Sequence, residues 1–155
     1  MYVRISAKTD YAIRAVVEMA AVSPDGHLVK AESVADAQQI PLRFLLGILN
    51  ELRHAGIVES RRGVEGGYRL AKPAVDITIA DIIRAIDGPL ANVAGVRPDA
   101  LHLTGSAAPL QEVWVSLRSS IREVLERVTI ADVVNGDLPA EVLARAKDAD
   151  AWARR

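Results

Sequence analysis

Two short predicted helices followed at once by a glycine-rich hairpin constrain the fold of this chain most. The helical spacing of apolar residues predicts helices at 31–38 and 41–55, with Ile40-Pro41 between them. Pro41 suits the first position of the second helix, where a missing N–H costs nothing, and Gly56 ends that helix. Two helices joined by so tight a turn predict a helix-turn-helix.

The residues after Gly56 predict a β-hairpin. Strands are expected at 57–60 and 68–70, around the turn Arg61-Arg62-Gly63-Val64-Glu65-Gly66-Gly67. Gly66 and Gly67 are expected to supply the positive φ angles that such a turn needs. A hairpin directly after a helix-turn-helix is a wing, so the sequence predicts a winged helix-turn-helix.

The remaining segments predict a mainly α chain in which this wing is the only β structure. A first helix is expected at 8–21 and a fourth at 79–86, where Thr78 provides the N-cap. Residues 90–108 show no periodicity and predict a loop that is long for a compact domain. Residues 135–155 predict a helical tail.

A long helix is expected to start at Leu110, where apolar residues begin to alternate at steps of four and three. The residues of this seam are Leu110, Trp114, Leu117, Ile121, Val124 and Val128. This spacing is typical of a coiled coil and predicts a homodimer held by the helix. An ordinary amphipathic helix packed on its own domain is the alternative.

Several classes of protein are excluded or disfavoured by what the 155 residues lack. There is no cysteine, which excludes disulfides, a thiolate nucleophile and a Cys-ligated zinc or iron-sulfur site. His27, His54 and His102 do not cluster at metal-ligand spacing, so neither a metal nor a cofactor is expected. No phosphate loop, nucleophile elbow or carboxylate pair indicates an enzyme. No secretory signal or long apolar run is present, which predicts a soluble cytoplasmic protein without a membrane partner.

The order of these parts resembles the Rrf2-type winged-helix regulators, a family that includes the iron-sulfur cluster regulator and nitric-oxide-sensing repressors. The resemblance covers about residues 1–134. The matching strings are Ile5-Ser6-Ala7-Lys8 with Tyr11-Ala12, Leu52-Arg53-His54-Ala55-Gly56-Ile57-Val58, Arg62-Gly63 with Gly66-Gly67-Tyr68-Arg69-Leu70, Ile79-Ala80-Asp81-Ile82-Ile83, and Val128-Thr129-Ile130-Ala131-Asp132-Val133. The wing string together with its two flanks is specific, whereas a glycine pair alone would indicate little.

The chain departs from this family in two places. Cluster-binding members carry three cysteines in the loop before the dimerisation helix, and the corresponding residues 90–108 have none. Many members present Glu-Gln on the outer face of the recognition helix, where this chain has Leu46-Gly47. Neither the cluster nor the operator sequence therefore carries over from the resemblance.

The resemblance implies double-stranded DNA as the partner, and the second helix of the helix-turn-helix offers the face to read it. Burial of Leu45, Ile48, Leu49 and Leu52 would leave an outward face made of Arg43, Leu46, Gly47, Asn50 and His54. Arg43 can bond guanine or phosphate, Asn50 adenine or phosphate, and Leu46 can touch a thymine methyl. Gly47 permits close approach of the helix. The alternative is a plain solvated face.

The wing and the first helix offer further DNA contacts. Arg61 and Arg62 sit at the hairpin tip and can enter the minor groove, and the resemblance points to Arg62 in particular. Gly66 and Gly67 let backbone amides approach a phosphate. Phosphates could also meet Lys8, Tyr11 and Arg14, although Tyr11 suits the core equally well.

These observations predict a DNA-binding transcription regulator, expected to be a repressor, that acts as a homodimer on an inverted repeat without an iron-sulfur cluster. We expect a winged helix-turn-helix at 1–89, a sensor-type loop at 90–108, a dimerisation helix and turn at 109–134, and a tail at 135–155. The alternative is a dimeric winged-helix adaptor or sensor that acts through a protein partner or a small-molecule effector.

Overall fold

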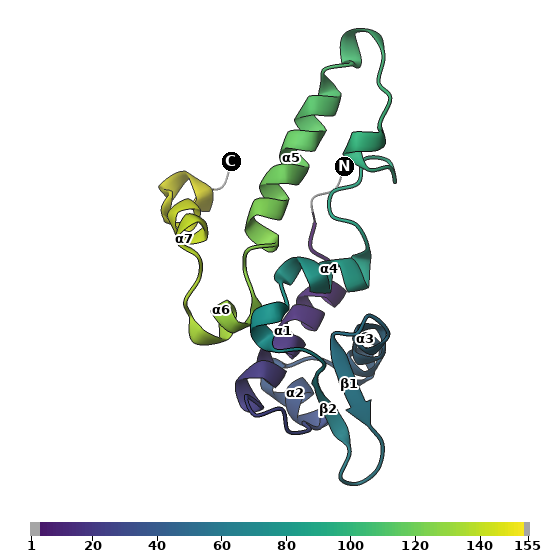
Figure 1. Ribbon diagram of the computed structural model, residues 1–155, viewed down its shortest axis with the longest axis vertical. Helices are drawn as coiled ribbons and strands as arrows, with labels where there is room; N and C mark the ends of the chain where they lie inside the picture. The colour runs from purple at the N-terminus through teal and green to yellow at the C-terminus, as the bar shows by residue number, and fades with distance from the viewer. Residues whose placement is uncertain (1–3, 154–155) are drawn as a thin grey trace.

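A computed structural model describes residues 4–153 and shows a winged head from which one long helix stands away (Figure 1). The head is built from α1 (Ala7–Val22), α2 (Ala31–Gln38), α3 (Leu42–His54), the strands β1 (Val58–Arg61) and β2 (Gly67–Leu70), α4 (Ile79–Asp87) and α6 (Ile130–Asn135). The long helix is α5 (Leu110–Leu125), and α7 (Ala140–Lys147) lies in the tail. The fold is mainly α with one small hairpin, as the sequence predicts.

The helix-turn-helix forms where the sequence places it, and its turn has a clear local cause. Gln39 takes the left-handed conformation with φ 53°, which ends α2, and its N–H bonds the carbonyls of Ala35 and Asp36. The next side chain, Ile40, is buried and anchors the turn. Pro41 is the N-cap of α3 rather than its first helical residue, so the helix begins one position later than predicted.

The wing is an antiparallel hairpin that a third extended segment joins. Val58 pairs with Leu70 and Arg61 with Gly67, which sets the register of β1 and β2. Val29 and Tyr68 exchange two backbone hydrogen bonds of 2.8 Å, so the segment that leads into α2 lies beside β2. This contact between segments 39 residues apart is absent from the sequence prediction, and it ties the wing to the helix-turn-helix.

The core of the head lies between α1 and α3. The four apolar residues predicted to be buried on α3 are 0–1% exposed: Leu45, Ile48, Leu49 and Leu52. They pack in one cluster with the small residues of α1, and Met19 of α1 fills the same cluster. Such burial is the main source of stability for a small domain.

Two copies of one short string begin α4 and α6. Thr78 and Thr129 each start a Thr-Ile-Ala-Asp segment, and each accepts a bond from the backbone of the aspartate three residues on, whose carboxylate bonds back. The two caps lie side by side, since Ile79 N donates to Val128 O and Ile130 N donates to Ile77 O. The chain therefore returns to the head after α5, and residues 128–130 pack there.

This return corrects the predicted end of the long helix. The helix was expected to reach Val128, but α5 ends at Leu125 and Val128 lies beyond it, 6% exposed. Val128 is therefore buried against its own chain and is not part of the surface of α5. The seam on α5 consists of Leu110, Trp114, Leu117, Ile121 and Val124.

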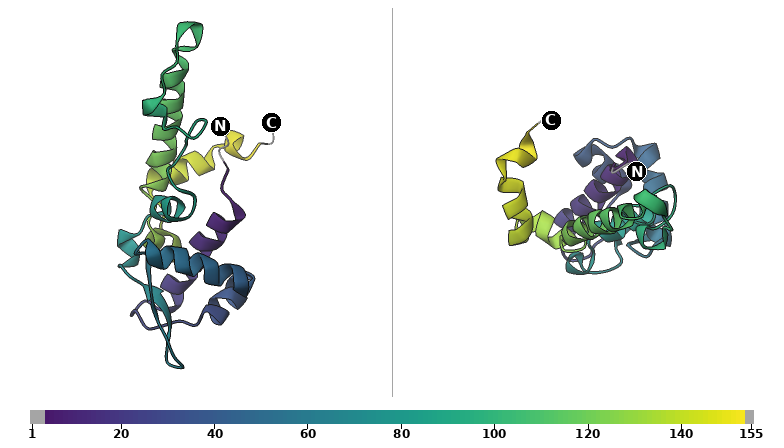
Figure 2. Two further views of the ribbon diagram at one scale, coloured as in Figure 1. Left: turned by 90° about the vertical axis from the view of Figure 1, so that its right-hand side faces the viewer. Right: turned by 90° about the horizontal axis from the view of Figure 1, so that it is seen from above.

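The helix α5 and the loop before it extend away from the wing along the long axis of the molecule (Figures 1 and 2). The loop, residues 90–108, contains two short 3-10 turns, Pro98–Ala100 and Gly105–Ala107. Asp99 accepts hydrogen bonds from Arg97 and from Arg118, which joins the loop to α5. Within residues 4–153, no helix is long and apolar enough to cross a membrane.

Candidate nucleic-acid interface

The outward face of α3 has the composition that the helical spacing predicts. Arg43, Leu46, Gly47 and Asn50 are all exposed, on the side of the helix opposite its buried residues. Arg53 Nη2 donates a 3.0 Å hydrogen bond to Asn50 Oδ1, which orients the Asn50 amide while leaving its N–H groups free to donate. The face thus combines the cation of Arg43, the oriented amide of Asn50 and the apolar side chain of Leu46. They surround Gly47, which has no side chain.

A cleft of about 360 Å³ joins this face to the wing. Leu46 and Asn50 of α3 line it together with Arg61, Arg62, Gly66 and Gly67 of the hairpin. Two further cations line the same cleft, Lys30 before α2 and Arg53 near the end of α3. Neither of these two cations is predicted from the sequence; for Arg53 the three-residue spacing from Asn50 on one helix is the available signal.

The glycines of the wing allow backbone segments to approach closely. A Cβ on Gly66 would lie 2.1 Å from the carbonyl oxygen of Arg61, and one on Gly67 would lie 2.6 Å from that of Val29. Gly66 does not have the positive φ that was expected of it, so its requirement is steric. Lys30 Nζ donates a 2.6 Å hydrogen bond to Val64 O, which ties the wing loop to the residue before α2.

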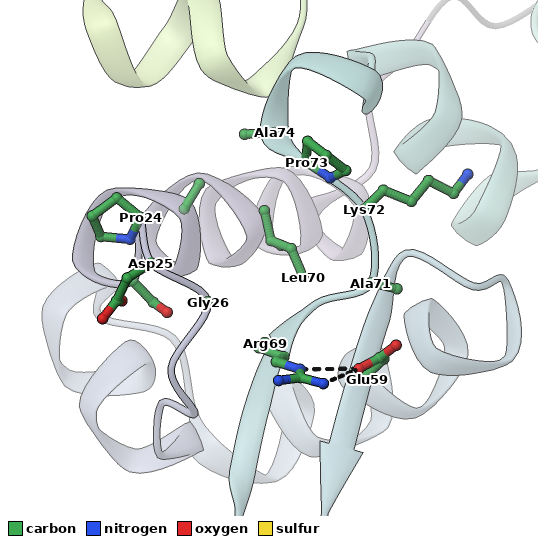
Figure 3. Close-up of a pocket in the computed structure, with 12 residues that line it drawn as sticks. Pro24, Asp25, Gly26, Glu59, Arg69, Leu70, Ala71, Lys72, Pro73 and Ala74 are labelled. Carbon is green, nitrogen blue, oxygen red and sulfur yellow. Dashed lines mark hydrogen bonds and ion pairs between the residues drawn. The ribbon is translucent and has the colours of Figure 1, made fainter.

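Charge on the wing is divided between paired and unpaired arginines. Arg69 and Glu59 face each other across the two strands at 3.0 Å, on the side of the hairpin shown in Figure 3. Arg61 and Arg62 are exposed and form no ion pair within residues 4–153. The tip of the wing therefore carries two available positive charges, whereas its base is locally neutral.

The three candidates on α1 have different surroundings. Lys8 is exposed and pairs with Glu51 of α3 at 2.6 Å. Tyr11 is half-buried, packs against the core and borders a groove between α1 and α3, so both expected roles are open to it. Arg14 bonds Asp10 at 3.1 Å and both the side chain and the carbonyl of Gln38. Its guanidinium is thus occupied in joining α1 to α2, and the structure does not bring it to the candidate interface.

The loop at 90–108 does not offer the ligands of an iron-sulfur cluster. The chain has no thiolate, and within the described residues no three His, Cys, Asp or Glu side chains gather as a metal site would require. Asp99 is already bonded by two arginines, and the hydrogen bonds from Arg97 hold its pKa below the ordinary value. These donors do not fit an iron-sulfur cluster.

Comparison with known proteins places the chain in a family. A family described as an iron-dependent transcriptional regulator, Rrf2, matches residues 5–136. The chain belongs to the Rrf2 family. A Mycobacterium tuberculosis protein named as an HTH-type transcriptional regulator is 48% identical over 145 residues, which are 94% of this chain and 89% of that protein. A Neisseria meningitidis protein of the same description is 34% identical and covers 86% and 92% of the two chains.

Solved structures of Rrf2-type regulators share the fold. CymR of B. subtilis, the global cysteine regulator, superposes with a TM-score of 0.73 at 29% identity, over 87% of this chain and 98% of that one. IscR of T. potens gives 0.66 at 29% identity, over 99% and 93%. This Rrf2 protein is accordingly a winged-helix, DNA-binding transcription regulator, in a family of regulators rather than enzymes.

Proposed function

We propose that this Rrf2 protein is a homodimeric repressor that binds an inverted-repeat operator and does so without an iron-sulfur cluster. The single observation that carries the proposal is the cleft between α3 and the wing. It brings together residues 46, 50, 61 and 62, and every charged group that lines it except Glu32 is a cation. A surface of this sign and shape suits the backbone and base edges of a duplex.

In this proposal the two sides of the cleft meet different grooves of the DNA. The outward face of α3 enters the major groove, where Arg43 bonds guanine or phosphate and Leu46 contacts a thymine methyl. Asn50, oriented by Arg53, donates to a base or a phosphate. Arg61 and Arg62 at the wing tip enter the adjacent minor groove, whose negative potential attracts arginine.

We infer that the dimer forms along α5. None of residues 110–125, all of which the structure describes, is buried in the single chain. Leu110 and Val113 are 43% and 51% exposed, and Trp114, Leu117 and Val124 are half-buried on the same helix. Ile121 also packs on a small cluster around Ile83 and Leu90 of its own chain. A second α5 would cover the exposed part of this surface and pair two recognition helices for an inverted repeat.

The test of the DNA-binding mode uses two arginines of the same hairpin. Arg62→Ala should weaken operator binding by about 1–3 kcal/mol, because an unpaired cation at the wing tip is lost. Arg69→Ala removes the same charge from the wing, but at a site where Glu59 already neutralises it. We expect the matched variant to bind within a few tenths of a kcal/mol of wild type. Equal losses for the two variants, measured by fluorescence anisotropy at physiological salt, would contradict the proposed wing contact.

The proposed absence of a cluster has its own measurement. Clusters are held by several thiolates, and this chain offers none at any position. Protein purified without oxygen should therefore contain no stoichiometric iron, show no cluster absorbance, and bind its operator equally before and after treatment with nitric oxide. Stoichiometric iron with visible absorbance would overturn this part of the proposal.

A second candidate function is a sensor that responds to a small molecule or a protein through the loop at 90–108. Two buried polar atoms, Asn92 Oδ1 in this loop and Arg118 Nε on α5, have no hydrogen-bond partner within the described residues. A bound polar group could satisfy them, and loop rearrangement would act on α5 and on the spacing of the two heads. Operator binding that a metabolite extract alters in wild type, but not in Asn92→Ala, would favour this candidate.

A further inference from the structure

A groove between α1 and α3 lies on the side of α3 that faces away from the wing. It has a volume of about 740 Å³, and its lining includes Tyr11, Pro41, Phe44 and Ile48 as well as the charged residues Lys8, Arg43 and Glu51. We propose that this groove holds one sugar–phosphate strand of the operator, with the ring of Phe44 against the deoxyribose. The inference rests on the proposed function and names a contact that this function does not include.

The position of the groove on the helix points to a backbone strand. At 100° per residue, Arg43, Gly47 and Asn50 point outward from α3, whereas Phe44 and Glu51 lie on its flank toward α1. A helix about 10–12 Å across fills a major groove about 12 Å wide, so its flanks meet the two walls of that groove. Those walls are sugar and phosphate. The wing-side flank carries Arg53, and the groove occupies the other flank.

The chemistry of the lining matches such a wall. Phe44 is 66% exposed in the single chain, so much of its surface is open to a partner. A deoxyribose offers an apolar face that the ring can cover, and the phosphates on either side of the sugar would meet Lys8 and Arg43. Arg43 forms no ion pair within residues 4–153, so its charge is available. An open trough with an apolar floor and cations at its rim suits an extended anionic strand.

Gly47 supports a close approach at the edge of this groove. Its helical φ is one that any residue adopts, and a Cβ built on it would have no described atom within 4 Å apart from its chain neighbours and the backbone of its own helix. Glycine within a helix costs about 1 kcal/mol relative to alanine, and neither backbone conformation nor packing inside this chain requires it. Space is therefore kept at Gly47 for something outside the chain, and the adjoining groove continues that space.

Glu51 and Lys8 allow a test in which two substitutions should change the DNA affinity in opposite directions. Its carboxylate pairs with Lys8 at 2.6 Å and lines the same groove, so it would lie near the incoming phosphates. Removing the carboxylate frees Lys8 and removes a repulsion, which should tighten DNA binding. Removing the ammonium should weaken it. A groove that DNA does not enter would give neither change.

The experiment measures operator and random-duplex affinity over a range of salt for four variants. Phe44→Ala should bind both duplexes about tenfold more weakly, with an unchanged salt slope, because the lost contact is apolar and releases no counterion. Phe44→Leu should recover part of the loss. Lys8→Gln should lower the slope by about 0.9, and Glu51→Gln should raise the affinity for both duplexes.

Several outcomes would overturn the proposal. If Phe44→Ala has a native circular dichroism spectrum and unchanged DNA affinity, DNA does not occupy the groove. The same conclusion follows if a small ligand binds in the groove while DNA is bound. A Phe44→Ala loss confined to the operator would assign the ring to a base instead of a sugar. The proposed function fails separately, because it requires that wild type binds the operator and that Arg62→Ala weakens it.

Discussion

The helices α1 and α5 have the same length and opposite surroundings. Each has 16 residues, yet α1 buries six of them and α5, described throughout its length, buries none. The buried residues of α1 are mostly small, so α3, α4 and α6 can pack closely around it. The apolar residues of α5 are larger and stay partly exposed. The comparison shows that a helical pattern reveals which face is apolar and leaves open what covers that face.

The largest effect expected from this comparison is loss of the dimer. Val113→Glu combined with Leu117→Glu would place two charges on the exposed apolar side of α5, where pairing would bury them at a cost of several kcal/mol. Sedimentation at tens of micromolar should show a monomer, with operator affinity lower by two orders of magnitude or more, because one head reaches only one half-site.

A matched variant tells whether the side of α5 matters. Ser119 lies about 120° around the helix from Val113 and about 160° from Leu117, so Ser119→Glu adds a charge on another side of the helix. This variant should remain a dimer with wild-type affinity. If the double variant stays a dimer, or if Ser119→Glu becomes a monomer, then the apolar side of α5 is not the surface that a second copy covers.

An intermediate effect is expected where fold and function make opposite demands on the head. Gly47→Ala should raise the free energy of unfolding by about 0.5–1 kcal/mol, because a helix-interior glycine is replaced without any clash. The same methyl group should weaken DNA binding, since it stands on the outward face of α3. Chemical denaturation and operator titration on one preparation measure both changes.

Gly56→Ala provides the control for this prediction. Gly56 has φ +73°, a conformation that strains an L residue, so the same methyl group should lower stability there by about 1 kcal/mol. If both variants are destabilised alike, the claim that Gly47 serves a purpose outside the chain is wrong.

The smallest effect concerns the ion pairs that join the head to α5. Hydrogen bonds from Arg122 and then from Arg84 of α4 lower the pKa of the Glu126 carboxyl. A lowered folded pKa means that this stabilisation is present at neutral pH and is lost as pH falls below about 4, through the folded value. Glu126→Gln should therefore cost a few tenths of a kcal/mol at pH 7, and this cost should shrink as the pH falls through the folded pKa.

Glu123→Gln separates this junction from the rest of α5. Glu123 pairs with Arg145 of α7 at 2.6 Å, so its loss affects the contact with the tail and leaves the contact with α4 intact. Limited proteolysis near the end of α5, where Glu126 contacts Arg84 of α4, should be faster in Glu126→Gln than in Glu123→Gln. Equal rates would mean that the Arg84 contact does not hold α5 in place.

The sequence alone was sufficient for several features that depend on neighbouring residues, although it misplaced the start of α3 by one residue and the end of α5 by three. The bounds of α2, the buried and outward faces of α3, the wing and the Thr78 cap follow from local spacing and from single turn residues. The absence of thiolates in the loop at 90–108 is likewise a property of the residues themselves. These features could be predicted because hydrogen-bond geometry and helical period act over a few residues.

The tertiary structure alone decided which of these pieces meet. Only in the folded chain does Lys30 bond the wing loop and Val29 pair with Tyr68. Likewise, only there does Arg14 donate to the carbonyl of Gln38 and Val128 become buried against the head. It also left Phe44 exposed beside α1, where helical spacing alone could not show that a groove would form. Such contacts join residues far apart in the chain, and their energy depends on how whole elements pack together, which no local pattern encodes.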